Sequence, residues 1–406
     1  MTGAFPAAVA AAPGLVVQPR MGMADPAAMR AGLLAVKRAA ATTVGTLTLD
    51  SYTRVGDADA ALAALREGRA LNGYPIVAHP REVTRAVLDG VADAGFPVQV
   101  RHGSADPRAI FARMAELGLA ASEGGPVSYC LPYSRRPLRE STAHWTEACA
   151  RLAETVPGAH LETFGGCLMG QLCPPSLLIA ISVLEGMFFR ANGIRSVSLS
   201  YSQQTNQDQD AEAVRALRAA AACYLPDVDW HVVLYTYMGV YPSTPGGARL
   251  LLAAAARLAA GAGARRLIVK TVAEAHRIPT VAENVAALEE ASAAASAAPP
   301  LPEADTGLLA EARAIIDAVL GLHDDIGQAM VTAFHTGLLD VPYCLHPDNA
   351  NQARCHIDDT GWLRWSAAGG LPLPRSAVPA RADRLGSSEL VAALSHVAAR
   401  FDAAAL

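Results

Sequence analysis

Basic clusters, paired cysteines and long uninterrupted apolar stretches are all missing from this sequence. The formal net charge of −5 and the absence of any run of lysine and arginine argue against a nucleic-acid-binding protein. The longest apolar runs, residues 174–189 and 250–264, contain Glu185 and Arg257, so neither is predicted to span a membrane. Residues 1–17 are rich in alanine but lack a basic segment, and we therefore predict no signal peptide.

The seven cysteines show neither a Cys-x-x-Cys pair nor a repeated ligand spacing. This pattern is typical of reduced thiols in a cytoplasmic protein, and it predicts no metal site. The glycine-rich fingerprints GxGxxG and GxxxxGK(S/T), which bind dinucleotides and nucleotide phosphates, do not occur either. What remains is an apolar, alanine-rich chain of 406 residues that can bury a large core.

Short candidate strands alternate with alanine- and leucine-rich segments of helical period. Eight alternations of strand and helix predict a (β/α)8 barrel, the TIM barrel, with a parallel sheet. The predicted strands are residues 15–18, 46–50, 75–78, 98–101, 160–164, 197–201, 231–235 and 267–270. The clearest helical segments are residues 58–69, 81–94, 176–191, 210–223 and 246–260.

The chain divides at a segment rich in serine, alanine and proline, residues 292–305, which we predict to be a linker. Residues 1–291 then form the barrel, and residues 306–406 form a helical and irregular C-terminal extension. With this strand count, residues 123–133 become an insertion after the fourth strand, on the catalytic face. The alternative is that residues 126–129 are themselves a barrel strand.

Three arginines occupy similar places in the predicted barrel, where the C-terminal ends of the strands face the active site. Arg20, Arg54 and Arg101 lie at or just past the ends of predicted strands one, two and four. Because an arginine fork binds a carboxylate with two parallel hydrogen bonds, three arginines suit a small dianionic substrate. The alternative is three separate salt bridges to structural acids.

The predicted insertion adds a carboxylate and two phenols, Glu123, Tyr129 and Tyr133. These groups can accept the hydrogen bonds of a substrate ammonium group, although a solvated loop glutamate and two packing tyrosines would look the same in sequence. Beside the arginines, they predict a pocket for an amino-dicarboxylic acid. Lys270 and Glu274, four residues apart, fit equally well a pair on a helix surface or a site for the ribose hydroxyls of a cofactor.

The sequence resembles the epsilon, catalytic subunit of the glutamate mutase (methylaspartate mutase) family over residues 14–351. Each motif that carries the resemblance is weak alone, but together and in order they are specific. They are Val17-Gln18-Pro19-Arg20, Leu49-Asp50-Ser51-Tyr52-Thr53-Arg54, Leu71-Asn72-Gly73-Tyr74-Pro75, Gln99-Val100-Arg101-His102-Gly103, Glu123-Gly124-Gly125 through Tyr133, Glu162-Thr163-Phe164-Gly165, Pro174-Pro175-Ser176, Ile268-Val269-Lys270-Thr271 and residues 333–342.

The resemblance implies a barrel that binds the adenosyl side of adenosylcobalamin above its C-terminal face. It also implies a radical isomerisation of L-glutamate to (2S,3S)-3-methylaspartate. A small cobalamin-binding sigma subunit would be required, in a heterotetramer that contains two copies of this chain. The Asp-x-His-x-x-Gly signature of such cobalamin domains is incomplete here, because Leu234 stands where the glycine is needed after His231.

The resemblance also assigns individual residues to the site. The predicted substrate-binding residues are Arg20, Arg54, Arg101, His102, Glu123, Tyr129 and Tyr133. The predicted cofactor-binding residues are Gly22, Asn72, Pro132, Tyr241, Lys270, Glu274 and Ile278. Asn72 is, by residue type alone, more often a turn residue than a ligand.

Two other functions stay open at this point. A non-catalytic relative could retain the barrel and bind an amino-dicarboxylic acid, and a neighbouring short reading frame with Asp-x-His-x-x-Gly would argue against it. An ordinary lyase or aldolase is disfavoured because no glycine-rich phosphate turn follows predicted strand seven or eight and no cluster of metal ligands occurs.

Overall fold

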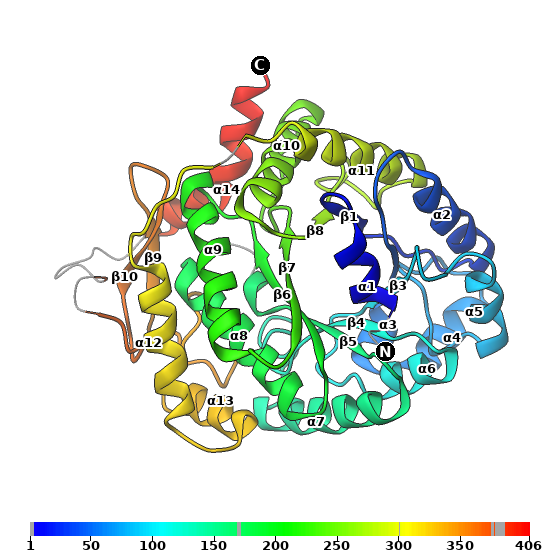
Figure 1. The fold of residues 1–406 in the computed structure, drawn as a ribbon, viewed down its shortest axis with the longest axis horizontal. Coiled ribbons are helices and arrows are strands. Elements are labelled where there is room, and N and C mark those ends of the chain that lie inside the picture. Colours follow the sequence, from blue (N-terminus) through cyan, green and yellow to red (C-terminus); the bar gives the residue numbers. More distant parts are fainter. Residues whose placement is uncertain (1–3, 169–171, 300, 375–376, 378–385) are drawn as a thin grey trace.

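Eight parallel strands form a closed sheet in the computed structural model, which describes residues 4–168, 172–299, 301–374, 377 and 386–406. The sheet order is β1-β8-β7-β6-β5-β4-β3-β2, and a bridge between Val17 and Thr43 joins its two ends. The predicted (β/α)8 barrel is therefore confirmed (Figure 1). The strands are β1 (Val16–Pro19), β2 (Gly45–Thr48), β3 (Val98–Arg101), β4 (Ala121–Gly124), β5 (His160–Thr163), β6 (Ser196–Ser202), β7 (Asp229–Tyr235) and β8 (Arg266–Val269).

One predicted strand is wrong, and another was missed. Residues 75–78 form a turn, in which the amides of Ala78 and His79 donate to the carbonyl of Pro75. Proline fixes its own φ at a value that suits a tight turn, and the amide of Ile76 donates to the carbonyl of Tyr74 across Pro75. The missing strand is β4, which contains Glu123. Arg101 therefore ends strand three rather than strand four.

The alternative strand at residues 126–129 is wrong as well. These residues form turns after β4, with the amide of Tyr129 donating to Gly125 and that of Leu131 to Val127. Glu123 thus lies on a barrel strand, and the two tyrosines lie on the loop that follows it. The carboxylate and the phenols predicted on one loop come from two different elements.

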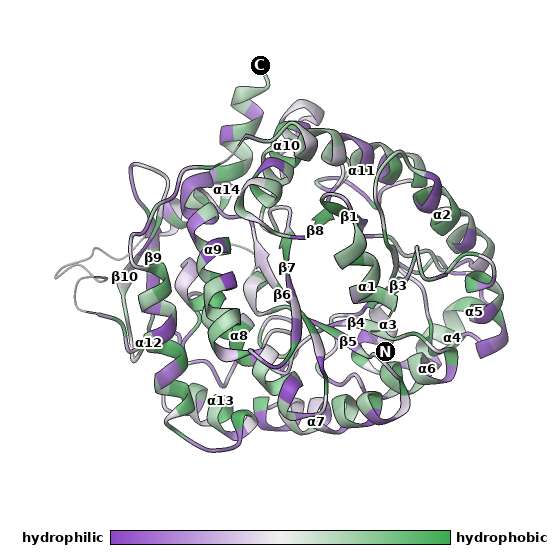
Figure 2. Ribbon diagram, viewed as in Figure 1, coloured by the Kyte–Doolittle hydropathy of each residue, from purple (hydrophilic) through white to green (hydrophobic). Residues whose placement is uncertain are grey.

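Helices surround the sheet and bury their apolar faces against it. The outer edges of α2 and α5 carry hydrophilic residues (Figure 2). Local capping sets several helix starts; for example, Asp25 accepts from the amide of Ala28 at 2.7 Å, and Thr280 forms a capping box with Glu283. The surrounding helices are α2 (Pro26–Arg38), α3 (Ser51–Val55), α4 (Ala58–Arg66), α5 (Arg81–Leu88), α6 (Arg108–Leu117), α7 (Leu138–Thr155), the 3-10 helix η1 (Gly165–Cys167), α8 (Pro175–Ala191), α9 (Gln207–Tyr224), α10 (Pro245–Ala262) and α11 (Val281–Ser296).

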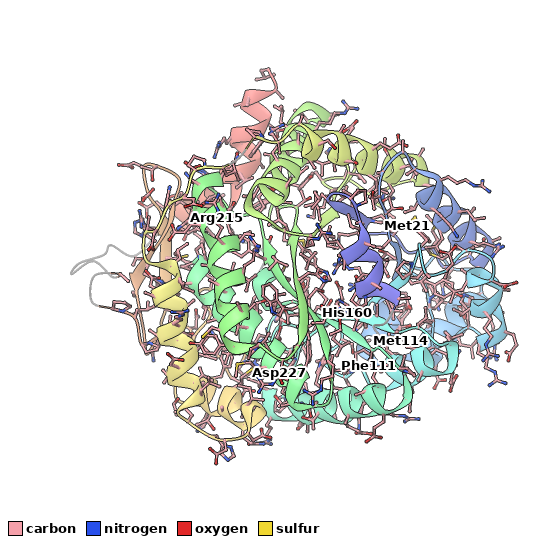
Figure 3. The ribbon with its side chains drawn as sticks, in the orientation of Figure 1. Met21, Phe111, Met114, His160, Arg215 and Asp227 are labelled. Atoms are coloured by element: carbon pink, nitrogen blue, oxygen red, sulfur yellow. The ribbon has the colours of Figure 1, made fainter. Side chains whose placement is uncertain are left out.

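The N-terminal end of the barrel is closed by α1 (Ala4–Ala11), which lies inside the ring of helices (Figure 1). Phe5 stacks on His160, a residue near the centre of the molecule in Figure 3, with the ring centres 5.1 Å apart. The guanidinium group of Arg266 also lies over the ring of Phe5, 5.0 Å from the ring centre. With this end plugged, a ligand can reach the barrel interior from the C-terminal ends of the strands.

The C-terminal extension packs on the outside of the barrel, against α8, α9 and α10. It contains α12 (Leu308–Leu320), α13 (Ile326–His335), an antiparallel hairpin of β9 (Arg354–Ile357) and β10 (Leu363–Ala367), and α14 (Ser387–Ala404). Arg215 of α9, labelled in Figure 3, donates to the carbonyls of Leu301 and Pro302 and so holds the incoming segment.

The predicted linker, residues 292–305, starts too early. Helix α11 continues to Ser296, because its alanines and serines extend the helix rather than end it. Pro300 lies outside the described residues, as does part of the proline-rich segment before α14, and the division into three domains stays a prediction. Within the described ranges, no helix is both long and apolar enough to cross a membrane.

Candidate active site

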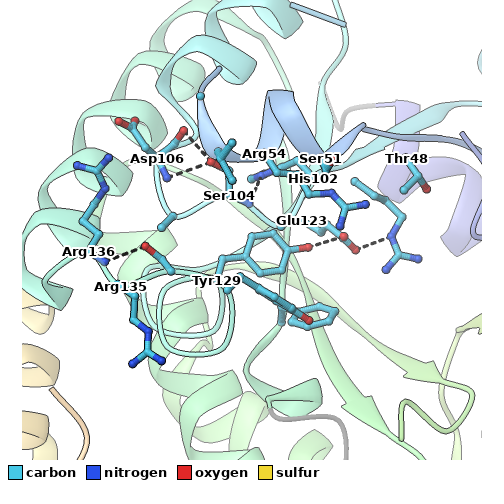
Figure 4. Close-up of a pocket in the computed structure, with 18 of the residues that line it drawn as sticks. Thr48, Ser51, Arg54, His102, Ser104, Asp106, Glu123, Tyr129, Arg135 and Arg136 are labelled. Atoms are coloured by element: carbon cyan, nitrogen blue, oxygen red, sulfur yellow. Dashed lines mark hydrogen bonds and ion pairs between the residues drawn. The ribbon is translucent and has the colours of Figure 1, made fainter. Parts of the chain in front are cut away.

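All seven residues predicted to bind the substrate line one cavity at the C-terminal ends of the barrel strands (Figure 4). Its volume is about 730 Å³, which is ample for a small amino acid. The seven residues are Arg20, Arg54, Arg101, His102, Glu123, Tyr129 and Tyr133. The parallel strands bring them together, because the C-terminal ends of all eight strands meet at the same rim.

The three arginines reach this rim in different ways. Arg20 directly follows β1, and Arg101 is the last residue of β3. Arg54 lies instead on the short helix α3, whose start is capped by Asp50. Arg54 Nε and Nη2 donate to the carbonyl of Leu49 at 3.2 and 3.1 Å, and Nη1 is left for a ligand.

Arg101 and Glu123 form a buried ion pair at the floor of the cavity. The distance from Nε to Oε2 is 2.7 Å, and the two residues are only 4% and 3% exposed. Nη1 of Arg101 is buried and has no hydrogen-bond partner among the described residues. A buried guanidinium nitrogen without a partner is costly, so a ligand acceptor at this position would relieve that cost.

The carboxylate of Glu123 is surrounded by donors. Oε1 accepts from the phenol of Tyr129, and Oε2 accepts from the phenol of Tyr235 at 2.8 Å in addition to Arg101. A carboxylate offers about four acceptor positions, so one position on Oε1 stays open. Burial, together with the charge of Glu123, holds the pKa of Tyr129 well above its usual range, so this phenol stays a neutral donor.

Tyr235 was not predicted as a site residue, although it ends β7 as Arg101 ends β3. Its phenol also contacts Glu162, which forms a fully buried ion pair with Arg266 one layer deeper. Although burial works against it, Arg266 holds the pKa of Glu162 below its usual value. The barrel interior thus contains two carboxylates balanced by two guanidinium groups.

His102 forms part of the wall of the cavity. Burial, and next the charge of Arg54, lower the pKa of His102 to about 3, so the imidazole is neutral at physiological pH. Its Nδ1 accepts from the amide of Ser104 at 3.0 Å, and the ring stacks on Trp145 with centres 5.8 Å apart. These contacts orient the ring in the cavity wall, and its Nε2 is buried without a hydrogen-bond partner among the described residues.

Three of the predicted cofactor residues form a compact group past β7 and β8, in which Lys270 and Tyr241 are buried and Glu274 is half-buried. Glu274 Oε1 lies 3.4 Å from Lys270 Nζ and 2.6 Å from Arg20 Nη1. Lys270 Nζ also lies 4.9 Å from the ring centre of Tyr241. Burial lowers the pKa of Lys270 to about 8, and the residue is only 5% exposed. The alternative of a pair on a helix surface is therefore wrong.

The other predicted cofactor residues are more scattered. A Cβ on Gly22 would lie 2.0 Å from the carbonyl oxygen of Thr48, so glycine is required there for close approach of two backbones. Asn72 Oδ1 accepts from the amide of Ser51 at 2.9 Å and so joins its loop to the start of α3. Pro132 lines a second cavity of about 360 Å³ that adjoins the first, and Ile278 is exposed. Their cofactor roles stay predictions.

Two further arginines, Arg135 and Arg136, line the main cavity and were not predicted. Their position two and three residues after Tyr133 was the available signal. Five arginines therefore face two acids, Asp106 and Glu123, within a chain whose net charge is negative. This favours an anionic ligand. In the part of the chain that the structure describes, no group of three or more histidine, cysteine, aspartate or glutamate residues could hold a metal ion.

A TIM barrel whose strand ends place arginines, a buried carboxylate and phenols around one polar cavity has the arrangement of an enzyme-type barrel. The chain belongs to the family described as "Methylaspartate mutase E chain (MutE)", whose profile matches residues 6–388. It is similar to proteins named glutamate mutase epsilon subunit, and this family membership indicates that the chain is a subunit of a mutase.

Three of these relatives show how far the similarity extends. The protein of Halobacterium salinarum is 36% identical over 348 residues, which cover 80% of this chain and 71% of the relative. That of Haloarcula marismortui is 33% identical and covers 84% and 72%, respectively. That of Escherichia coli O157:H7 is 30% identical and covers 81% and 72%.

Proposed function

We propose that this chain is the catalytic subunit of an adenosylcobalamin-dependent glutamate mutase, which interconverts L-glutamate and (2S,3S)-3-methylaspartate. The observation that carries this proposal is the buried Arg101–Glu123 pair. Arg101 has a buried nitrogen without a partner, and Glu123 has an unused acceptor position. L-glutamate offers two carboxylates and one ammonium group. The cavity offers arginine donors for the former and one carboxylate acceptor for the latter.

The substrate contacts follow from the unused donors and acceptors. Arg101 Nη1 and Arg54 Nη1 are available to substrate carboxylates, and Arg20 lies at the same rim. The open acceptor position of Glu123 takes the ammonium group. Arginine forks fix both the position and the orientation of a carboxylate, and such fixation is what a rearrangement of a reactive substrate requires.

The group of Lys270, Glu274 and Tyr241 fits the ribose of an adenosyl cofactor. Lys270 supplies a donor, Glu274 an acceptor, and the hydroxyl of Tyr241 is buried without a partner among the described residues. Adenosylcobalamin, when bound, supplies the radical chemistry that carbon-skeleton rearrangement needs. The residues of this chain bind and orient the two ligands and keep water from the space between them.

A partner subunit is part of the proposal. The described chain exposes several large apolar residues, and three of them line the two cavities: Val55, Tyr133 and Leu345. Such a rim favours coverage by another protein. We propose that a small cobalamin-binding subunit covers it, in a heterotetramer with two copies of this chain, and that the complex is cytoplasmic, as free cysteines favour.

The test is reconstitution. The purified chain is mixed with a cobalamin-binding small subunit, adenosylcobalamin and L-glutamate, and 3-methylaspartate is measured. We expect product only in the complete mixture; product without the small subunit would contradict the partner requirement. No product from the complete mixture would refute the mutase, and calorimetric binding of L-glutamate in that case would favour the non-catalytic amino-dicarboxylate-binding barrel.

A further inference from the structure

Glu185 of α8 is a fully buried carboxylate on the outer side of the barrel wall. No cation of the described chain forms an ion pair with it, and its oxygens are bound by neutral donors instead. Oε1 accepts from the amide of Ser128 at 2.8 Å. Oε2 accepts from the hydroxyl of Ser128 at 2.9 Å and from the amides of Gly165 and Phe164 at 2.9 and 3.3 Å.

These donors belong to two separate loops at the rim of the cavity. Ser128 directly precedes Tyr129, whose phenol donates to Glu123, and Phe164 itself lines the cavity. The rings of Tyr129 and Phe164 are in contact, with centres 5.0 Å apart. One carboxylate therefore joins the loop after β4 to the loop after β5, directly behind two side chains of the site.

The loop after β4 is shaped to admit this carboxylate. A Cβ on Gly125 would lie 2.0 Å from Oε1 of Glu185, so only glycine leaves the necessary space. Keeping a charge in this place is expensive, and burial raises the pKa of Glu185 to about 7 although all of its donors lower it. An apolar side chain would fill the same place at lower cost, and it could not bind both loops.

We propose that Glu185 is a positioning residue for the substrate site, because it holds Tyr129 and Phe164 in place through the backbone of both loops. Tyr129 in turn occupies one acceptor position of Glu123 Oε1 and leaves the other position of that oxygen for the substrate ammonium group, because Oε2 already accepts from Arg101 and Tyr235. The kinetic part of this inference rests on the proposed mutase function. The structural part, the tie between the two loops, does not.

The Glu185→Gln variant separates these parts. A carboxylate presents two acceptor oxygens, but an amide presents one acceptor and one donor, so the amide of at least one loop faces an N–H group and loses its partner. We expect KM for L-glutamate to rise about tenfold or more in the complex with small subunit and cofactor. Deuterium uptake should also increase in peptides that cover residues 125–129 and 163–166.

The Asp210→Asn variant is the matched control. Asp210 of α9 is another fully buried carboxylate, and burial raises its pKa to about 7 as well. Its partners are the hydroxyl of Tyr201 at 2.8 Å and the amide of Gln204 at 2.9 Å, and neither residue lines the cavity. Because a hydroxyl can both donate and accept, asparagine keeps both contacts. KM should stay within about threefold of wild type.

The outcomes decide the inference in every case. Unchanged KM and unchanged uptake in Glu185→Gln, or equal changes in both variants, would overturn it. If Glu185→Gln does not fold, Ser128→Ala removes only the hydroxyl contact and should raise uptake in the same two loops, and unchanged uptake there would overturn the tie. If the wild-type complex makes no 3-methylaspartate, the mutase proposal fails, while deuterium uptake still tests the tie.

Discussion

Replacement of Arg101 by lysine tests the substrate clamp most directly. Lysine keeps the positive charge beside Glu123, 2.7 Å from Nε in the wild type, so the buried ion pair can re-form. What is lost is the second, diverging nitrogen Nη1, which is buried and without a partner until a ligand arrives. A hydrogen bond between charged groups contributes roughly 1.5–3 kcal/mol, which corresponds to a loss of about 10- to 150-fold in kcat/KM for L-glutamate.

The assay compares steady-state kinetics and thermal unfolding of Arg101→Lys with those of Arg113→Lys. Arg113 of α6 donates to the carbonyls of Ile76 and His79 and does not line the cavity, so its replacement controls for a general arginine-to-lysine effect. We expect a large kinetic defect only in the Arg101 variant, with a similar change in Tm for both. Normal kinetics in Arg101→Lys would mean that Arg101 serves only to neutralise Glu123.

Three further predictions concern the carboxylate, the cofactor group and the pH dependence of stability. Glu123→Gln should raise KM for L-glutamate roughly tenfold or more and leave cofactor binding intact, whereas loss of both would indicate misfolding. Lys270→Ala should raise the apparent cofactor constant of the assembled complex without changing discrimination among amino acids; an unchanged constant with unchanged turnover would remove Lys270 from the cofactor site. Burial raises the pKa of Asp210 to about 7 from its usual 3.8, so the folded protein binds more protons than the unfolded chain between these values, and stability falls as pH rises through this window. Asp210→Asn should therefore show a smaller drop in Tm from pH 5 to pH 7 than wild type. An equal drop would contradict the raised pKa of Asp210.

Much of the barrel was predictable because its signals are local. The helical periods near residues 176–191 and 246–260 predicted α8 and α10 within two residues at each end. The third strand was mispredicted for an equally local reason. The apolar residues after Pro75 look like a strand, whereas β4, Ala121–Gly124, contains a serine, a glutamate and a glycine. Its polar side chains serve the barrel interior and the site, where propensity is no guide.

The site itself shows where local reasoning ends. Arginines near strand ends could be placed at one rim from the sequence, because all parallel strands of a barrel point the same way. The partners of these arginines could not be placed from the sequence. Tyr235 and Glu123 are 112 residues apart, and only the closed sheet brings the phenol of Tyr235 to 2.8 Å from Oε2 of Glu123. The same holds for Glu185, which the sequence showed only as a charge interrupting an apolar run.

The sequence by itself therefore determined the alternation of strands and helices, the set of residues available at the rim, and the family to which the chain belongs. The tertiary structure alone decided which of those residues pair: Arg101 with Glu123, Arg20 with Glu274, and Glu185 with two loops. The physical reason is that composition and period are properties of neighbouring residues. Hydrogen-bond and ion pairing in a buried site depends instead on the register and closure of strands that are distant along the chain.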